Sequence, residues 1–343
     1  MNTQMKGITL AHGVPALADD LPKPRLGRGE VLVRVSHSAV NAHEFELASK
    51  PLIRASRWLA GYRGKVRTGL EFSGWVESAG AHWEPGTRVM GYIDITRGHN
   101  SHAQWLTIPR TQLAQIPPSV SLHEAAAIPM GAQTALVALR TVARAKRGDA
   151  VLVFGASGGV GLYAIQLARH WGVEVTAVAR SEHHEGLLTL GASKVVDYRE
   201  VGPAQMTGRY DAILELSDTL RLSDVRHLLA DGGAFIPADP LAHWPEIVAY
   251  RAARWLLVDR GDSVLLEEIA SLTSRGVVRP VVAAQFPLEQ WRQAIEQSRS
   301  RSVLGRVLLN FAEDLPATAD PPGPGATSRA PSGISAETRD RTR

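Results

Sequence analysis

The chain contains no cysteine among its 343 residues. Disulfide bonds, thiolate zinc sites and a cysteine nucleophile are therefore excluded. The sequence also lacks a run of about 18 apolar residues, so no segment is predicted to span a membrane. Its first ten residues do not contain the apolar core of a signal peptide, and we therefore expect a cytoplasmic protein.

The sequence also lacks a set of residues with the spacing of zinc ligands. The twelve histidines do not form a set with the spacing of zinc ligands. His183 and His184 are adjacent, so their rings diverge, and His99 and His102 have no third ligand beside them in their glycine-containing loop. The sequence therefore predicts no metal site. The residues around Ser157 also lack the G-x-S-x-G elbow of a serine hydrolase.

The chain has no strong excess of one charge. It carries 38 Lys and Arg against 34 Asp and Glu, which gives a formal net charge of +4. The basic residues are scattered, so no nucleic-acid partner is expected. Hydrophobic residues make up 44% and charged residues 21%, as in a globular enzyme. The length favours two domains.

The most informative stretch runs from Val151 to Gly161. Four apolar residues predict a strand buried on both faces, and a glycine-rich turn and an amphipathic helix follow it. This order is typical of a dinucleotide-binding unit, because the turn brings the backbone close to a pyrophosphate and the helix start offers free N–H groups. The predicted pyrophosphate-binding residues are Ala156, Ser157, Gly158, Gly159, Val160 and Gly161. Alanine in the first glycine position makes the motif imperfect.

The end of the next predicted strand, Glu174 to Arg180, bears on the choice of cofactor. An NAD site has an acidic residue about 20 residues after the glycine turn, which binds the ribose 2′-hydroxyl. This chain has Ala179-Arg180-Ser181 there, and we expect no acid beside Arg180. Arg180 can pair with a 2′-phosphate and Ser181 can donate a hydrogen bond to it. NADPH is therefore the predicted cofactor; alternatively, Arg180 is only a solvated cation.

The remaining pattern predicts an α/β protein. Residues 1 to about 118 are rich in short strands and turns, including 30–36, 69–80 and 85–91, and predict a small antiparallel barrel-like domain. A capping box of Ser121 and Glu124 then begins a helix that extends to about residue 145, with a possible kink at Pro129. Further predicted strands alternate with helices, which indicates a parallel doubly wound sheet: 194–197, 211–216, 233–236 and 255–259.

The C-terminal part returns to the first domain. Residues 262–275 are predicted to be helical, and 277–286 and 303–310 to be strands of the β-rich domain. The predicted domains are residues 1–120 with 277–312, and residues 121–276. Residues 313–343 are rich in Pro, Gly, Ser, Thr and Ala with almost no large apolar side chains, and are predicted to be disordered.

Several stretches occur in the order known from one family. They are Val40-Asn41 with Glu44, Gly69 to Val76 with Gly80, Pro85 to Val89, Leu122 to Pro129 with Thr134-Ala135, Gly155 to Gly161, Leu190 to Ala192 with Asp197-Tyr198, and Gly305 to Val307. As an ordered set, they resemble the medium-chain dehydrogenase/reductase superfamily, in its zinc-free quinone oxidoreductase branch, which includes zeta-crystallin. The resemblance covers roughly residues 5 to 311.

The resemblance implies a GroES-like β-rich catalytic domain, a Rossmann domain that binds NADPH, and often a homodimer. It implies hydride transfer to a quinone or an α,β-unsaturated carbonyl compound. By position, Tyr198 and His183 fall near the 2′-phosphate, and Thr134 and Met130 fall beside the nicotinamide; helix packing is the alternative for the last two. Two other functions stay open: a zinc-independent carbonyl or alcohol reductase, and an inactive member with a binding or structural role.

The chain departs from the family around its predicted active site. Ala42 replaces a proline, and Glu46 and Leu52 stand where quinone reductases often carry tyrosines. Asn41 can donate a hydrogen bond to a developing oxyanion but cannot supply a proton. The predicted catalytic residues are Asn41, Tyr62 and His43; Tyr92 and solvent are further proton sources, and His43 is alternatively structural.

Overall fold

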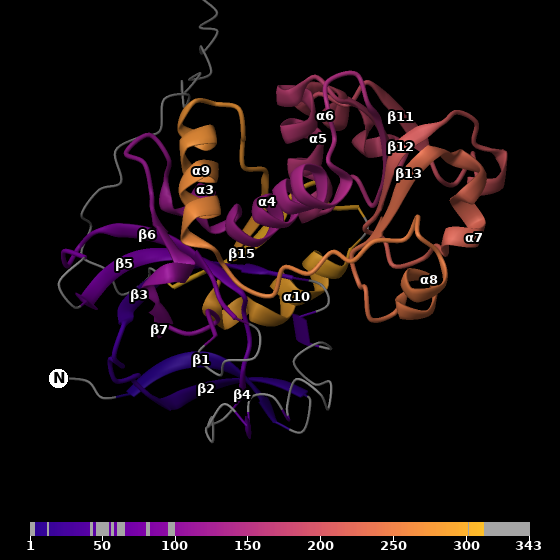
Figure 1. The fold of residues 1–343 in the computed structure, drawn as a ribbon. Coiled ribbons are helices and arrows are strands. Elements are labelled where there is room, and N and C mark those ends of the chain that lie inside the picture. The colour runs from indigo at the N-terminus through magenta and orange to yellow at the C-terminus, as the bar shows by residue number, and fades with distance from the viewer. Residues whose placement is uncertain are drawn as a thin grey trace, which may run out of the picture.

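The computed structural model of the chain describes residues 4–11, 14–41, 44–45, 55, 58–59, 66–79, 83–94, 100–300 and 302–311. Its strands gather into a β-rich part and a parallel sheet, and helices α4 and α10 lie between the two (Figure 1). None of the helices in these ranges is both long and apolar enough to cross a lipid bilayer.

The β-rich part is built around one long strand, β3 (Glu30–Val40). It pairs antiparallel with β5 (Glu71–Ala79), β7 (Trp105–Pro109) and β15 (Arg306–Asn310). The sheet continues through β6 (Arg88–Tyr92) to β8 (Leu113–Gln115) at one edge and ends at β14 (Val282–Pro287) at the other. A smaller sheet has the order β2-β1-β4, formed by Val14–Pro22, Gln4–Ala11 and Val66–Arg67. The last two described strands, β14 and β15, thus join the same sheet as β3.

The parallel sheet has the order β11-β10-β9-β12-β13. Its strands are Lys194–Asp197, Glu174–Ala179, Ala150–Phe154, Tyr210–Glu215 and Leu229–Pro237. In β9, Val151 and Val153 belong to one apolar core and Leu152 and Phe154 to another, because alternate side chains point to opposite faces. The prediction of a strand buried on both faces, in a doubly wound sheet, is confirmed.

Six further helices of the described residues pack on the two parts, the last two of them against strands of the β-rich part. They are α5 (Gly159–Trp171), α6 (His184–Leu190), α7 (Leu222–Val225), α8 (Trp244–Ala249), α9 (Ser263–Ser274) and α10 (Trp291–Arg299). Six short elements complete the described chain: Arg110–Gln112, Val137–Ala143, Ser181–His183, Pro203–Gln205, Arg226–Leu228 and Leu288–Gln290.

The predicted helix after Ser121 is present but interrupted. Ser121 Oγ accepts a hydrogen bond from the Glu124 amide at 3.4 Å, and Glu124 accepts one from the Ser121 amide, so the capping box is confirmed. The helix stops after α3 (Leu122–Ala126) and restarts as α4 (Pro129–Leu136). Pro129 begins the second helix because a proline lacks the N–H that a helix interior requires.

Two strand predictions differ from the structure. Residues 255–259 form no strand; only the neighbouring Ala253 makes an isolated bridge, to Phe235 of β13. Trp255 and Leu257 are 49% and 72% exposed, and no strand among the described residues pairs with this apolar stretch. The strand predicted from residue 277 begins at Val282, because Gln166 of α5 binds both the backbone N–H and the carbonyl of Arg279.

Candidate cofactor and active site

The glycine turn lies at the carboxyl end of β9, the middle strand of the parallel sheet. A β-carbon on Gly155, which has a φ of +74°, would lie 2.8 Å from the Leu216 carbonyl oxygen. A β-carbon on Gly161 would lie 2.7 Å from Ala156 Cα. Both glycines are therefore needed for packing. Gly158 is exposed, and a β-carbon there would approach only the Gly155 oxygen, at 3.3 Å.

Helix α5 begins directly after Gly158 and has no side-chain cap. Its first-turn N–H groups, which include those of Gly159, Val160 and Gly161, have no acceptor within the helix and favour an anion. Ser157 is half-buried beside them. Ala156 is fully buried in the core, so only its backbone can contribute to binding. The turn thus has the features of a pyrophosphate site, and its assignment stays a prediction.

A second polar group lies where β10 and β11 end. The Arg180 Nε donates to the Tyr198 hydroxyl at 3.0 Å, and the Ser181 hydroxyl accepts from Arg199 Nη2 at 3.0 Å. The structure therefore brings together Arg180, Ser181 and Tyr198, three of the residues predicted to bind the 2′-phosphate. It adds Arg199, a cation that the sequence argument overlooked although it directly follows Tyr198.

Two features of this group differ from expectation. Acids do lie near Arg180: Glu182 Oε1 is 3.3 Å from Arg180 Nη1, and Asp197 accepts from the Ser181 amide at 2.8 Å. The expectation of no nearby acid was wrong because Glu182 follows Arg180 by two residues and because β11 carries Asp197 to the same sheet edge. His183 is 4% exposed, so its ring is not presented to solvent beside Arg180.

Arg306 connects the β-rich part with the glycine turn. Its Nη2 donates to Asn41 Oδ1 at 2.7 Å and to the Glu71 carboxylate, and all three residues are buried. A β-carbon on Gly159 would collide with Nη1 of the same guanidinium. The Nε of Arg306 is buried without a hydrogen-bond partner. The Nδ2 of Asn41 is buried and meets no acceptor at hydrogen-bond geometry, although the Asn41 side chain is near enough to the carboxyls of Glu44 and Glu71 to oppose the rise of their pKa values. Buried donors of this kind are normally satisfied, so a ligand oxygen is a fitting partner for them.

Helix α4 borders this cluster. The Met130 amide donates to Glu71 Oε2 at 2.9 Å, and a β-carbon on Gly131 would lie 2.7 Å from the Gly159 carbonyl oxygen. Met130 and Thr134 are the half-buried residues of α4, and the other six are buried. Because they are four residues apart, they share one face of the helix. This arrangement is compatible with their predicted place beside a nicotinamide.

Two buried carboxyl groups lie near Asn41. Burial raises the pKa of Glu71, which Arg306 opposes, and burial raises the pKa of Glu44 well above its usual value. Neither oxygen of Glu44 has a hydrogen-bond partner. His102 Nε2 is 3.4 Å from Glu44, but burial lowers the pKa of His102 to about 4. We therefore regard Glu44 and His102 as neutral neighbours, with a carbonyl of Ala39 accepting from the histidine at 3.2 Å.

The remaining proton donors are not equally placed. Tyr92 is buried and donates its hydroxyl to the Val258 carbonyl at 2.6 Å, and burial raises its pKa, so it is unsuited to act as an acid. His43 and Tyr62 lie outside the described residues. Across those described residues, no group of three His, Asp or Glu side chains could hold a metal ion.

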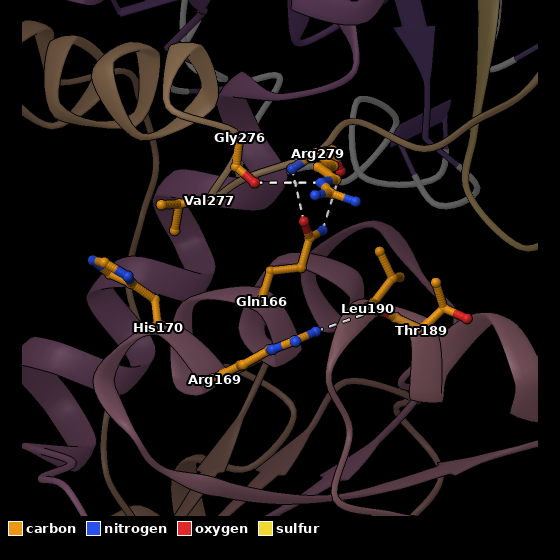
Figure 2. Close-up of a pocket in the computed structure, with 8 residues that line it drawn as sticks. All are labelled: Gln166, Arg169, His170, Thr189, Leu190, Gly276, Val277 and Arg279. Carbon is orange, nitrogen blue, oxygen red and sulfur yellow. Dashed lines mark hydrogen bonds between the residues drawn. The ribbon is translucent and has the colours of Figure 1, made fainter. Parts of the chain in front are cut away.

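Figure 2 shows a cavity of about 740 Å³ at the other end of α5. Gln166 lies at its base and donates to the Arg279 carbonyl at 3.1 Å while accepting from the Arg279 amide at 2.7 Å. None of the predicted cofactor or catalytic residues lines this cavity. Its contacts fix the segment that leads from α9 to β14.

Comparisons with known proteins bear on the family and the fold. Residues 190–309 match a family model described as a zinc-binding dehydrogenase. The quinone oxidoreductase of Sus scrofa is 27% identical over 321 residues, which cover 86% of this chain and 93% of that protein. The solved quinone oxidoreductase of Coxiella burnetii has 25% identity and a TM-score of 0.78, and the match covers 90% of this chain and 99% of that one.

A further relative is much longer. The polyketide synthase component PikAII of Streptomyces venezuelae is 28% identical over 334 residues. The match covers 90% of this chain but only 8% of that protein.

Proposed function

We propose that this chain, a member of the medium-chain dehydrogenase/reductase superfamily in its quinone oxidoreductase branch, is an NADPH-dependent reductase of quinones or α,β-unsaturated carbonyl compounds. The observation that carries the proposal is the position of Arg306. One buried guanidinium binds Asn41 and Glu71 and lies where a β-carbon on Gly159 would be. This position supports a role for the Asn41 amide toward the substrate, close to the proposed pyrophosphate site.

The residues present fit a nicotinamide dinucleotide. The α5 first turn and Arg306 would hold the pyrophosphate, because both offer N–H donors without partners. Arg180, Ser181 and Tyr198 would hold the 2′-phosphate. When bound, NADPH supplies the hydride, and the protein orients it and excludes water.

Asn41 has the clearest role toward the substrate. Its Oδ1 accepts from Arg306, which fixes the orientation of the amide. Its Nδ2 is buried, meets no acceptor at hydrogen-bond geometry and can donate a hydrogen bond to the acceptor oxygen as negative charge develops there. The amide cannot supply the proton, which His43, Tyr62 or solvent would deliver.

The proposal does not involve zinc. The chain has no cysteine, and among the residues that the structure describes, Glu44 and His102 are two ligands without a third, fewer than a zinc site needs. We expect the protein to consume NADPH only when a quinone or enone is added, and to do so also in the presence of a metal chelator. Turnover of simple aldehydes alone would favour the carbonyl reductase, and NADPH binding without any turnover would favour the inactive member.

Arg180→Ala is expected to weaken NADPH binding at least about tenfold, because a charge-assisted hydrogen bond to the 2′-phosphate would be lost. NADH binding should hardly change. Calorimetry with both dinucleotides measures this, and Lys194→Ala is a matched control that removes an exposed cation from the opposite end of β11. Equal losses for NADPH and NADH would show that Arg180 only supports the strand end.

We further propose that the protein forms a homodimer through the open edge of the parallel sheet. Among the described residues, β13 is the last strand at this edge, and the backbone beyond it makes the isolated Phe235–Ala253 bridge. Large exposed apolar side chains gather in the adjoining segment: Leu241, Trp244, Val248, Tyr250, Trp255 and Leu257. A second copy could cover these side chains and pair with the unpaired backbone.

The Val248→Asp/Leu257→Asp double variant is therefore expected to sediment as a monomer, whereas the unmodified chain sediments as a dimer. Val264→Asp changes an equally exposed residue, on α9, and should leave the dimer intact. Analytical ultracentrifugation measures the difference. An unmodified monomer, or a double variant that stays dimeric, would refute this interface.

A further inference from the structure

Glu182 lies between two arginines at the end of the parallel sheet. Its Oε1 is 3.3 Å from Arg180 Nη1, and its Oε2 is 3.9 Å from Arg199 Nη1. Each carboxylate oxygen thus faces a different guanidinium. The Glu182 side chain is 42% exposed, so solvent and ligands can reach this pair of contacts.

Contacts with β11 and Tyr198 hold the two arginines independently of Glu182. Arg199 donates to the Asp197 carboxylate from Nη2 at 2.6 Å and from Nε at 3.1 Å. The Asp197 side chain is 2% exposed and also accepts from the Ser181 amide. Arg180 donates to the Tyr198 hydroxyl. The cations are therefore fixed in place, whereas Glu182 is the exposed acid of the group.

The charges of this group balance only with Glu182 present. Arg180 and Arg199 carry two positive charges, and Asp197 and Glu182 carry two negative ones. These four side chains and Tyr198 form one connected set of contacts. Without the Glu182 carboxylate, the group would have one excess positive charge directed toward solvent. That charge would attract a phosphate.

We infer that Glu182 is an internal counter-anion, which occupies the position between Arg180 and Arg199 that the 2′-phosphate of a dinucleotide must take. The inference rests on the proposed function, since it deepens the proposed preference for NADPH. A phosphate carries up to two negative charges and three acceptor oxygens, so it can displace one carboxylate from two guanidinium groups. A ribose 2′-hydroxyl has no charge and cannot, but it can donate a hydrogen bond to the carboxylate.

Glu182 therefore acts in opposite directions on the two kinds of ligand. It competes with a 2′-phosphate for the arginines, and it accepts from a 2′-hydroxyl. A specificity residue of this kind sets the ratio of the two affinities without contacting the reacting atoms. Its removal should increase the preference for phosphorylated ligands.

Two nucleotides that differ only in the 2′-phosphate test this inference: adenosine 2′,5′-bisphosphate and adenosine 5′-monophosphate. Their dissociation constants are measured by calorimetry for the unmodified protein and for Glu182→Gln. The variant is expected to bind the bisphosphate about 3- to 10-fold more tightly. This change in affinity corresponds to the free energy of an exposed ion pair or slightly more. The variant should bind the monophosphate equally or more weakly. Glu185→Gln removes the same charge from an exposed position one turn along and should change neither constant.

The salt dependence of bisphosphate binding is a second test of the same variant. Because Glu182→Gln leaves an excess positive charge, its affinity for the bisphosphate should fall more steeply between 0.05 and 0.5 M salt, as expected for about one more unscreened charge. Unchanged or weaker bisphosphate binding by the variant would overturn the inference.

The cofactor proposal fails on a different measurement. If the unmodified protein binds both nucleotides equally, its preference for NADPH is refuted. If Glu182→Gln then gains a preference for the bisphosphate, Glu182 is nevertheless the competing anion. If it gains none, both the cofactor proposal and the Glu182 inference are wrong.

Discussion

Gly158→Val is expected to abolish dinucleotide binding while the fold survives. Gly158 has φ −80° and ψ 170°, a conformation that valine adopts without strain. A β-carbon there approaches only one atom within 4 Å, the Gly155 oxygen at 3.3 Å. The branched side chain would instead project at the exposed N-cap of α5, where the pyrophosphate must approach the backbone.

We expect a loss of at least about 100-fold in affinity, or roughly 2.7 kcal/mol, for NADPH and NADH alike, because both carry the same pyrophosphate. The melting temperature without cofactor should stay within a few degrees of that of the unmodified protein. Calorimetry and thermal unfolding measure the two quantities. Undiminished binding by Gly158→Val would show that the turn is only a strand-to-helix connection.

Gly161→Val is the informative comparison. Its β-carbon would lie 2.7 Å from backbone atoms of Gly155 and Ala156, which cannot move away as a flexible side chain could. This variant should therefore lower the melting temperature as well as the affinity. The contrast separates a glycine required by the ligand from one required by packing.

Arg306→Met is expected to have the largest combined effect. It removes a buried cation whose Nη2 donates to both Asn41 and Glu71. Loss of one partner from a buried ion pair costs about 3–5 kcal/mol, because the other charge is left uncompensated. Cofactor affinity should also fall by at least about 100-fold if the guanidinium binds the pyrophosphate, since two charge-assisted hydrogen bonds would be lost.

The Glu71→Gln/Arg306→Met double variant separates the two effects. It has no buried carboxylate at this position, so it should recover a large part of the lost stability. It still lacks the guanidinium, so cofactor affinity should not recover. Recovery of both would mean that Arg306 acts on the cofactor site only through Glu71.

The pH dependence of Arg306→Met has a defined sign. Burial raises the pKa of Glu71 and Arg306 opposes this effect, so removal of Arg306 should raise the pKa further. A carboxyl whose pKa is raised by folding binds more protons in the folded state than in the unfolded state. The folded state therefore loses stability as the pH rises above the pKa of the carboxyl in the unfolded chain. Relative to the unmodified protein, Arg306→Met should lose more stability at pH 8 than at pH 5. Denaturant unfolding at both values checks this.

The sequence by itself determined the local elements of the site. Four consecutive apolar residues predict a strand that is buried on both faces, and β9 packs against an apolar core on each face. The residues of the glycine turn, the capping box at Ser121 and the cation at Arg180 can likewise be identified from adjacent residues alone. Such features depend on backbone conformation and on neighbours within a few positions, which the sequence states directly.

The local sequence pattern was insufficient to predict features that depend on residues from elsewhere in the chain. Residues 255–259 have an apolar strand pattern, yet no strand forms, because a strand depends on the backbone beside it. Glu182 is next to Arg180 and Ser181 in the sequence, but its position between two arginines depends on Arg199 at the end of a different strand. His183 is equally close in sequence and is buried.

Only the tertiary structure decided the meeting of Asn41, Glu71 and Arg306. Arg306 is 265 residues from Asn41 and 235 from Glu71. The antiparallel pairing of β15 with β3 places Val307 opposite Val40, so the residues just beyond this pair, Arg306 and Asn41, lie at the same end of the two strands. That register depends on which apolar side chains of the two strands share the core. It is a property of the assembled sheet, so neither strand's sequence specifies it alone.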